Sequence, residues 1–302
     1  MARKIITSEA QNELSFFPEN EEKESGYIAR LMVLATMPHS KQRETYYKRK
    51  NGNFTLKIVG DPEIGLPYGP IPRLIMSWLT DEVVRKKERK IILGNSLSYY
   101  MRELGYTNIK GGKRGNINPV KEQTKRLFLS TISCTYSERE RDAGEIMTLV
   151  DRYNIWWTTK SEGNQLTLEE STITLSERFF NEIISCPVPI NMNTLRTLKG
   201  SSMALDIYFW LTYRNGRFMR NAENKNENDD GSDIEKTIKI PMENLQLQIG
   251  AGYPLGNRGR INFKANFLKA LKKVLSIYPN AGQFEIKKDA LMFTFGTPDI
   301  LP

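Results

Sequence analysis

A short stretch of this sequence occurs twice, and this duplication constrains the fold more than any other feature. The first copy begins Gly112-Lys113-Arg114-Gly115-Asn116-Ile117-Asn118, and the second begins Gly256-Asn257-Arg258-Gly259-Arg260-Ile261-Asn262. With an offset of 144 residues, seven of the 16 positions from Gly112 to Leu127 carry the same residue type in the second copy. Each copy reads as a flexible basic loop that opens an amphipathic helix, which is the form of a DNA-binding element.

The duplication extends upstream into a shared order of elements. Ile91–Tyr106 predicts a short strand and a helix that ends at a glycine turn, and Ile238–Tyr253 repeats this pattern. An aromatic helix precedes each, one around Trp78 and one around Trp210. The order of helix, strand, helix, turn, basic helix and strands is typical of a winged helix-turn-helix domain. We therefore predict an α+β chain of two tandem winged helix-turn-helix domains with β-hairpin wings. Chance similarity of two basic amphipathic helices is the alternative.

The length of 302 residues accommodates two compact domains. We expect a mobile N-terminal leader over residues 1–25, a first winged-helix domain over 26–176 and a second over 177–302. Strands between residue 132 and Leu175 fit an enlarged wing of the first domain. The polar, Asn-rich stretch 221–235 lies inside the second repeat, so we expect it to be a flexible loop insertion.

Composition excludes several classes of site. The net charge of +9 suggests a polyanionic partner, or serves solubility alone. His39 is the single histidine, and Cys134 and Cys186 are the two cysteines, which we expect to be reduced core residues. This set cannot form a usual zinc finger and disfavours a Ser-His-Asp relay, so we expect no metal, no cofactor and no enzyme activity. No run approaches the roughly 20 apolar residues of a membrane helix, and the N-terminus lacks a secretory signal. We therefore expect a cytoplasmic protein.

A helical wheel separates the two basic helices. In the second copy, one exposed arc is predicted to hold Asn262, Asn266, Lys269 and Lys273, and the remaining positions, including Ile261 and Ala265, are predicted to face the core. Asparagine can bind adenine and arginine can bind guanine, while lysine and arginine neutralise phosphates. We expect this helix to be the main base reader.

The same arc of the first copy holds Asn118, Glu122, Lys125 and Leu129. A carboxylate is repelled by phosphate, although it could accept a hydrogen bond from cytosine, so we expect this copy to contact mostly the DNA backbone or another protein. The predicted DNA contacts of both copies are Lys113, Arg114, Asn118, Lys121, Lys125, Arg258, Arg260, Asn262, Lys264, Asn266, Lys269 and Lys273.

Two further basic segments leave their roles open. The run Arg85-Lys86-Lys87-Glu88-Arg89-Lys90 reads equally as a solvated turn or as a phosphate contact. The run Tyr46-Tyr47-Lys48-Arg49-Lys50 mixes aromatic and basic residues that could touch nucleic acid, but a solvated loop is the preferred reading.

Several motifs together resemble the plasmid-encoded RepA replication initiators, over most of the chain from Ala29 to the C-terminal hairpin. The run Pro-Tyr-Gly-x-Ile-Pro-Arg, at residues 67–73, is the most specific of them. The stretches that carry the resemblance are Asn51–Leu56, Gly65–Leu74, Leu93–Leu97, Arg102–Gly105, Gly111–Lys113, Gln123–Phe128, Leu205–Arg214 and Gly250–Tyr253.

The resemblance implies a function that charge and periodicity cannot supply. Such proteins bind directly repeated sites at a plasmid origin in double-stranded DNA, open an adjacent AT-rich duplex and help to bring the host helicase or initiator proteins. Related initiators with tandem winged helices use one domain for dimer contacts, and the resemblance implies a homodimer whose monomers are the initiating form. By this analogy of architecture the first domain would make the dimer contacts.

Two other functions stay open at this point. A winged-helix transcriptional repressor, including one that represses its own gene, would bind DNA in the same way. A DNA-nicking enzyme would need a carboxylate or histidine cluster to hold its metal, and the sequence has none at convincing spacing. Asp229 and Asp230 are adjacent, but they fall in the expected flexible insertion, which is a poor place for precise metal ligands.

Overall fold

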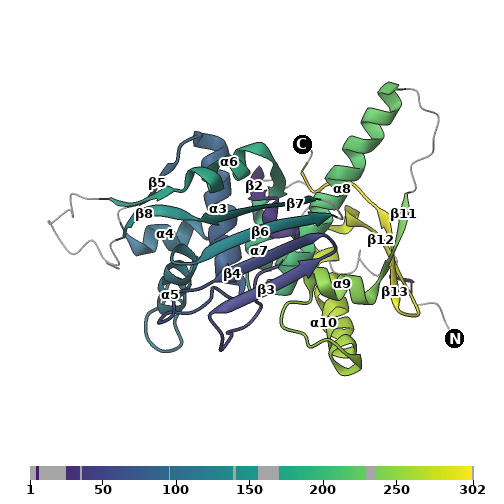
Figure 1. The fold of residues 1–302 in the computed structure, drawn as a ribbon, viewed down its shortest axis with the longest axis horizontal. Coiled ribbons are helices and arrows are strands. Elements are labelled where there is room, and N and C mark those ends of the chain that lie inside the picture. The colour runs from purple at the N-terminus through teal and green to yellow at the C-terminus, as the bar shows by residue number, and fades with distance from the viewer. Residues whose placement is uncertain are drawn as a thin grey trace. The chain divides into compact units, whose positions relative to one another are not determined.

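The chain is α+β, as predicted, and it divides into two compact units (Figure 1). The computed structural model describes residues 5–6, 25–34, 36–94, 96–138, 141–155, 170–228 and 236–300. Tyr27–Pro187 forms one unit, called here the N-terminal unit, and Val188–Pro302 with Met1–Gly26 forms the other, called here the C-terminal unit. The expected leader over residues 1–25 lies outside the described residues, apart from Ile5, Ile6 and Ser25.

The elements up to residue 186 are β1 (Ile5–Ile6), β2 (Ser25–Ala29), α2 (Leu31–Leu34), β3 (Tyr46–Asn51), β4 (Phe54–Val59), α3 (Pro70–Lys86), β5 (Lys90–Gly94), α4 (Leu97–Glu103), α5 (Ile117–Phe128), β6 (Thr131–Glu138), β7 (Arg141–Thr148), β8 (Val150–Asn154), β9 (Ser171–Leu175) and α6 (Glu177–Ser185). The elements that follow are β10 (Pro187–Asn191), α7 (Met192–Leu198), α8 (Ser202–Asn228), β11 (Thr237–Pro241), α9 (Met242–Ile249), α10 (Asn257–Leu275), the 3-10 turn η1 (Pro279–Ala281), β12 (Gly282–Lys287) and β13 (Ala290–Phe295).

Helix α3 is the central support of the N-terminal unit. It begins at Pro70, whose fixed φ angle suits the first helical position. The helix buries Leu74, Ile75 and Leu79, and its Trp78 meets Tyr100 of α4 edge to face at 5.5 Å. Helices α5 and α6 pack against α3. The expected aromatic core helix is therefore confirmed, and α5 is held by it.

The strands β3 to β9 of the N-terminal unit belong to two antiparallel sheets, in the orders β3-β4-β6-β7 and β5-β9-β8. The prediction of one enlarged wing after residue 132 is wrong in this respect. Only β8 and β9 join the strand β5, whereas β6 and β7 extend the hairpin of β3 and β4. Alternating residues identify a strand and its buried face, but they do not specify which other strand it pairs with.

The C-terminal unit packs α8 on its basic helix α10, as the N-terminal unit packs α3 on α5. Helix α9 packs on α10 and β11. The sheet order is β1-β12-β13-β11, with all pairs antiparallel, and the predicted closing hairpin is confirmed as β12 and β13. Trp210 of α8 packs against Phe293 at 5.5 Å, and Phe263 and Phe267 of α10 are fully buried.

The stretch 221–235 is not a loop throughout, because α8 continues through it to Asn228. Figure 1 shows the end of α8 running beyond the sheet of its own unit. A helix already formed gains one hydrogen bond for each residue added, so a polar segment with good helix formers can extend it without burying apolar surface. Residues 229–235 lie outside the described part of the chain.

Candidate nucleic-acid interface

The duplicated stretch keeps two glycine features in both units. Gly112 and Gly256 both have positive φ, 81° and 119°, which non-glycine residues rarely adopt. A Cβ on Gly115 would lie 2.1 Å from the carbonyl oxygen of Lys110, and a Cβ on Gly259 would lie 1.9 Å from that of Pro254. In each copy the glycine therefore packs against the carbonyl of the residue five positions earlier.

The two copies differ in the length of the turn that leads into the basic helix. Strand β5 aligns with β11 at an offset of 147 residues, whereas the basic stretch aligns at 144, so the first copy carries three additional turn residues. Helix α10 begins at Asn257, which places Arg258 and Arg260 in its first turn and not in a flexible loop as predicted. In the first copy the chain becomes helical only at Ile117, so Lys113 and Arg114 stay in the turn, where both are exposed.

The longer turn of the first copy is fastened by Asn116. Its side-chain oxygen accepts a hydrogen bond from the Lys110 amide at 2.9 Å, and its side-chain nitrogen donates to the Asn108 carbonyl at 2.7 Å. Arg260 is the residue at the matching position of the second copy, so the duplication keeps the glycines but exchanges this clamp for a cation.

Helix α10 presents one continuous exposed stripe. Beyond its first residue, Asn257, which is also exposed, its exposed positions follow the spacing of one helix face and are Arg258, Ile261, Asn262, Ala265, Asn266, Lys269, Lys272 and Lys273. The opposite face is buried through Gly259, Phe263, Phe267, Ala270, Leu271, Val274 and Leu275. The four residues of the predicted reading arc, Asn262, Asn266, Lys269 and Lys273, are thus all exposed. We call this set of eight residues the α10 stripe.

Two residues predicted to face the core lie on the α10 stripe instead. Ile261 is 60% exposed, and Ala265 is exposed as well. Residue type suggested burial, but the early start of α10 and the packing of Phe263 and Phe267 turn this side outward. The sequence also gave no reason to select Lys272, whose exposure follows from its position one turn after Lys269.

Charge on the α10 stripe is concentrated at its two ends. Arg258 lies at the first turn and three lysines at the last turns, with no acidic residue between them. Among the described residues, no carboxylate is recorded as an ion-pair partner of Arg258, Lys269, Lys272 or Lys273. The centre of the stripe carries amide and methyl groups, which suit base edges, and its ends carry cations, which suit phosphates.

Two other predicted contacts of this copy have intramolecular partners. Arg260 lies 3.7 Å from the carboxylate of Glu243 on α9. Lys264 donates from Nζ to the carbonyl oxygen of Lys288 at 3.0 Å, which ties α10 to the turn between β12 and β13. Lys264 can thereby orient the hairpin relative to the helix.

Helix α5 exposes a different set. Asn118, Glu122, Lys125 and Leu129 are exposed, while Lys121 is half-buried. Glu122 is engaged by Arg126, with 2.8 Å between the guanidinium and the carboxylate. This pairing gives the Glu122 carboxylate a role within the helix, because it balances the charge of the buried Arg126.

Arg126 is a residue that sequence reasoning did not select. It is 6% exposed, donates to the Leu66 carbonyl at 3.1 Å and lies over the ring of Tyr68 at 5.4 Å. Gln123 accepts a hydrogen bond from the Tyr68 amide at 2.9 Å. The inner face of α5 therefore holds the Gly65–Gly69 segment, and the polar pattern of this helix face is the signal that could have indicated it.

The segment from Pro67 to Arg73 is held in place by the buried side chain of Arg73. Arg73 is buried and donates to the carbonyls of Met37 and Gly69, both at 2.7 Å. Burial of a guanidinium is favourable only when its donors are satisfied. The most specific motif of the resemblance thus joins α3 to the residues before β3, and it contributes no exposed DNA contact through Arg73.

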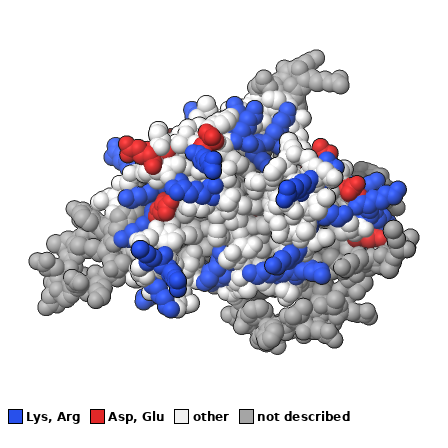
Figure 2. All heavy atoms as spheres, turned by 90° about the horizontal axis from the view of Figure 1, so that it is seen from below, with Lys and Arg blue, Asp and Glu red and all other residues white. Residues whose placement is uncertain are grey.

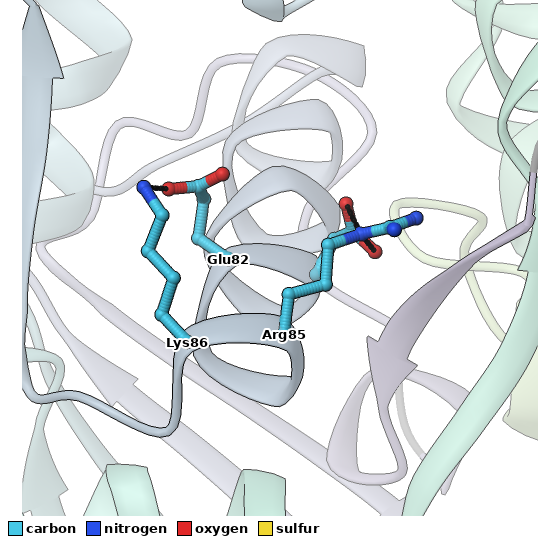
Figure 3. A network of polar contacts seen from close by, with 4 residues as sticks. Glu82, Arg85 and Lys86 are labelled. Atoms are coloured by element: carbon cyan, nitrogen blue, oxygen red, sulfur yellow. Dashed lines mark hydrogen bonds and ion pairs between the residues drawn. The ribbon is translucent and has the colours of Figure 1, made fainter.

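The basic run at the end of α3 is partly neutralised (Figure 3). Arg85 pairs with Asp81 at 2.9 Å, Lys86 pairs with Glu82, and Arg89 pairs with Asp151 at 2.6 Å. The hydrogen bond that Lys86 donates to the Glu82 carboxylate raises the pKa of Lys86. Because these cations already have carboxylate partners within the chain, the pairs argue against phosphate contact as the role of this run.

The view in Figure 2 shows Lys and Arg side chains spread over one face of the molecule, with Asp and Glu much sparser. No cluster of histidine, cysteine or carboxylate side chains within the described ranges could hold a metal ion. Cys134 and Cys186 form no disulfide and are half-buried. In the same part of the chain, no helix combines the length and apolarity needed to cross a membrane.

Comparisons with known proteins find similar solved structures and one matching family model. A crystal structure of domains 2 and 3 of RctB matches with a TM-score of 0.54 and 9% identity, covering 89% of this chain and 97% of that one. A second RctB structure of the same domains has a TM-score of 0.49 and 8% identity, covering 87% and 94%. No curated protein matches.

The model of the family described as "Plasmid encoded RepA protein" matches residues 66–230, which is more than half of the chain. The match includes α3, the first duplicated stretch and α8. The chain therefore belongs to the plasmid-encoded RepA family of replication initiators.

Proposed function

We propose that this protein initiates plasmid replication by binding directly repeated sites in double-stranded origin DNA, with α10 as the main reader. The α10 stripe is the observation that carries the proposal, because it combines an uncharged, hydrogen-bonding centre with cationic ends. A helix that enters the major groove needs this distribution, since base edges lie at the floor of the groove and phosphates along its rims.

We further propose that each unit is a winged helix-turn-helix domain. In the C-terminal unit the order is α8, β11, α9, α10, β12 and β13, with β11 paired to β13. In the N-terminal unit the order is α3, β5, α4, α5, β8 and β9, with β5 paired to β9, and β6 and β7 are inserted. The same strand pairing around the same helices supports a common domain type.

The N-terminal unit is assigned a weaker, backbone-directed role on DNA and the contacts of a homodimer. Its support is the state of α5, where Glu122 is exposed and paired and Leu129 offers no hydrogen bond. Lys113, Arg114 and Lys125 are exposed cations that can reach phosphates. We assign initiation itself to the monomer, and we include opening of the adjacent duplex and recruitment of host replication proteins in the proposal. The family to which the chain belongs is the support for these steps.

Footprinting of the full-length protein on the DNA that flanks its gene tests the function. An initiator protects several regularly spaced sites of equal length, and an origin fragment replicates only when the protein is supplied. A single protected palindrome without replication would instead indicate a repressor. Cleavage of the fragment by the purified protein with magnesium would indicate a nicking enzyme.

Salt dependence of binding tests the interface itself. The change Lys273→Gln removes a cation from the exposed end of α10 and should lower the slope of log affinity against log salt by about 0.9. The matched control is Lys86→Gln, which removes a lysine that is paired with Glu82 on α3 and should leave the slope unchanged. Equal slopes for both variants and the wild type would remove Lys273 from the interface.

A further inference from the structure

The centre of the α10 stripe holds a feature that phosphate binding does not require. Between Arg258 and Lys269, the exposed residues are Ile261, Asn262, Ala265 and Asn266. Two of these are aliphatic and two are amides. A leucine at the entry to the helix, Leu255, is also 75% exposed. Large aliphatic side chains in water are unfavourable at about 25 cal/mol per Å² of apolar surface, so an occupant that covers them would be stabilised.

The first copy shows that this isoleucine need not be exposed. Ile117 occupies the position equivalent to Ile261, and it is only half-exposed, with Cδ1 lying 3.8 Å from where a Cβ on Gly111 would be. Gly111, which lies in the longer turn of the first copy, is thus a close neighbour of Ile117. In the second copy the turn is shorter, and the same side chain projects from the helix at 60% exposure.

The surroundings of Ile261 narrow the kind of occupant. An apolar protein surface would cover the isoleucine but would leave Arg258, Asn262 and Asn266 without hydrogen-bond partners, which is costly. The major groove of DNA offers acceptors and donors to those residues. It also offers one methyl group, on C5 of thymine, and a bidentate pairing of asparagine with the N6 and N7 edge of adenine.

We propose that α10 reads adenine–thymine pairs at the centre of its site, with Ile261 contacting a thymine 5-methyl group and Asn262 or Asn266 binding adenine. This inference rests on the proposed function of α10 as the main reader. It names the bases read and adds Ile261, supported by Ala265, as a specificity-determining residue.

Replacing thymine with deoxyuridine isolates the methyl group, because the hydrogen-bonding edges stay the same. The full-length protein first selects its site from a random duplex library. Each thymine of the selected duplex is then replaced singly by deoxyuridine, and affinity is measured by fluorescence anisotropy. At one or two positions the wild type should bind about fourfold more weakly, which corresponds to about 0.8 kcal/mol for one buried methyl group.

The variant Ile261→Ala completes the cycle. It should bind the thymine duplex about as weakly as the wild type binds the deoxyuridine duplex, and it should no longer distinguish the two. Asn262→Ala and Asn266→Ala are the matched controls, since both should still respond to deoxyuridine. A circular dichroism melt confirms that each variant is folded, which is expected because all three side chains are exposed.

The outcomes separate this inference from the function beneath it. If the protein selects no duplex sequence, the proposed function fails. If it selects a site in which no thymine methyl group affects affinity, or if Ile261→Ala responds to deoxyuridine as the wild type does, the reader assignment stands and the methyl contact is wrong.

Discussion

A single methyl group added at Gly259 tests whether the turn geometry shared by the two copies holds the basic helix in place. In Gly259→Ala the new Cβ would lie 1.9 Å from the carbonyl oxygen of Pro254 and 2.8 Å from its carbonyl carbon. Real Cβ atoms essentially never come closer than 3.0 Å to another heavy atom, so the two backbone segments would have to separate by more than about 1 Å.

The magnitude follows from two opposing effects. Overpacking typically costs about 1–3 kcal/mol, and the upper part of this range applies because both partners are backbone and neither can rotate away. Alanine is favoured over glycine inside a helix by about 1 kcal/mol. The free energy of unfolding should therefore fall by about 1–2 kcal/mol, and the start of α10 should shift enough to weaken DNA binding.

Equilibrium unfolding in urea, with binding to a selected duplex measured in parallel, checks this expectation. The control is Gly216→Ala in α8, which lies in the same unit and where a Cβ would meet no atom within 4 Å. That change should stabilise the unit by about 0.5–1 kcal/mol and leave binding unchanged. If Gly259→Ala unfolds at the same urea concentration as Gly216→Ala and binds DNA normally, the close packing of this turn does not position α10.

Three further predictions address the supports of each unit. Arg126→Ala should lower the free energy of unfolding in urea by about 2–4 kcal/mol, because it leaves the Leu66 carbonyl unsatisfied. The control is Arg85→Ala, which also breaks an ion pair four residues apart on a helix, but with an arginine side chain that is 50% exposed; it should cost about 0.5 kcal/mol or less. Asn215→Leu should destabilise the C-terminal unit by about 2–3 kcal/mol in thermal melts, because the buried amide of Asn215 donates to the Ala281 carbonyl at 2.9 Å and accepts from the Gly296 amide at 3.2 Å; an unchanged melting temperature would show that this network adds nothing. Burial raises the pKa of Tyr100 well above its ordinary value of 10.0, so above about pH 10 the unfolded state ionises this phenol while the folded state keeps it neutral. The contribution of Tyr100 to the free energy of unfolding should therefore be constant below about pH 10 and fall above it. Tyr100→Phe should reduce this alkaline loss of stability in thermal melts between pH 9 and about 11.5.

The positions of the helices and of the closing hairpin could be predicted because each depends on local patterns. The apolar spacing around Trp78 and Trp210 sets two core helices, and Pro70 sets the start of one of them. The alternation in Gln283–Lys287 and Leu291–Phe295 sets the hairpin. These signals act within a few residues, and the packing of each unit agrees with them.

The partners of strands and of charged side chains could not be predicted in the same way. Nothing near Glu122 in the sequence shows that Arg126 turns inward and donates to the Leu66 carbonyl, 60 residues away. The ion pair between Arg126 and Glu122 forms in that inward position. The separation of β6 and β7 from the sheet of β5 is likewise a matter of long-range pairing. The helical continuation to Asn228 was missed because low apolar content predicts a loop, whereas the preceding helix decides the conformation.

Residue identities and the helical period are enough to show that one basic element is present twice, and they predict one polar, basic arc in its second copy at Asn262, Asn266, Lys269 and Lys273. The repeat and the arc depend on residue identity and on the period of a helix, and both can be read from the sequence. The folded chain was needed to show which of the two isoleucines faces solvent. Ile117 and Ile261 are the same residue in the same motif, but Ile117 is half-buried beside Gly111 of the longer turn, whereas Ile261 is 60% exposed. Exposure depends on what neighbouring segments cover, and that is settled only when the chain has folded.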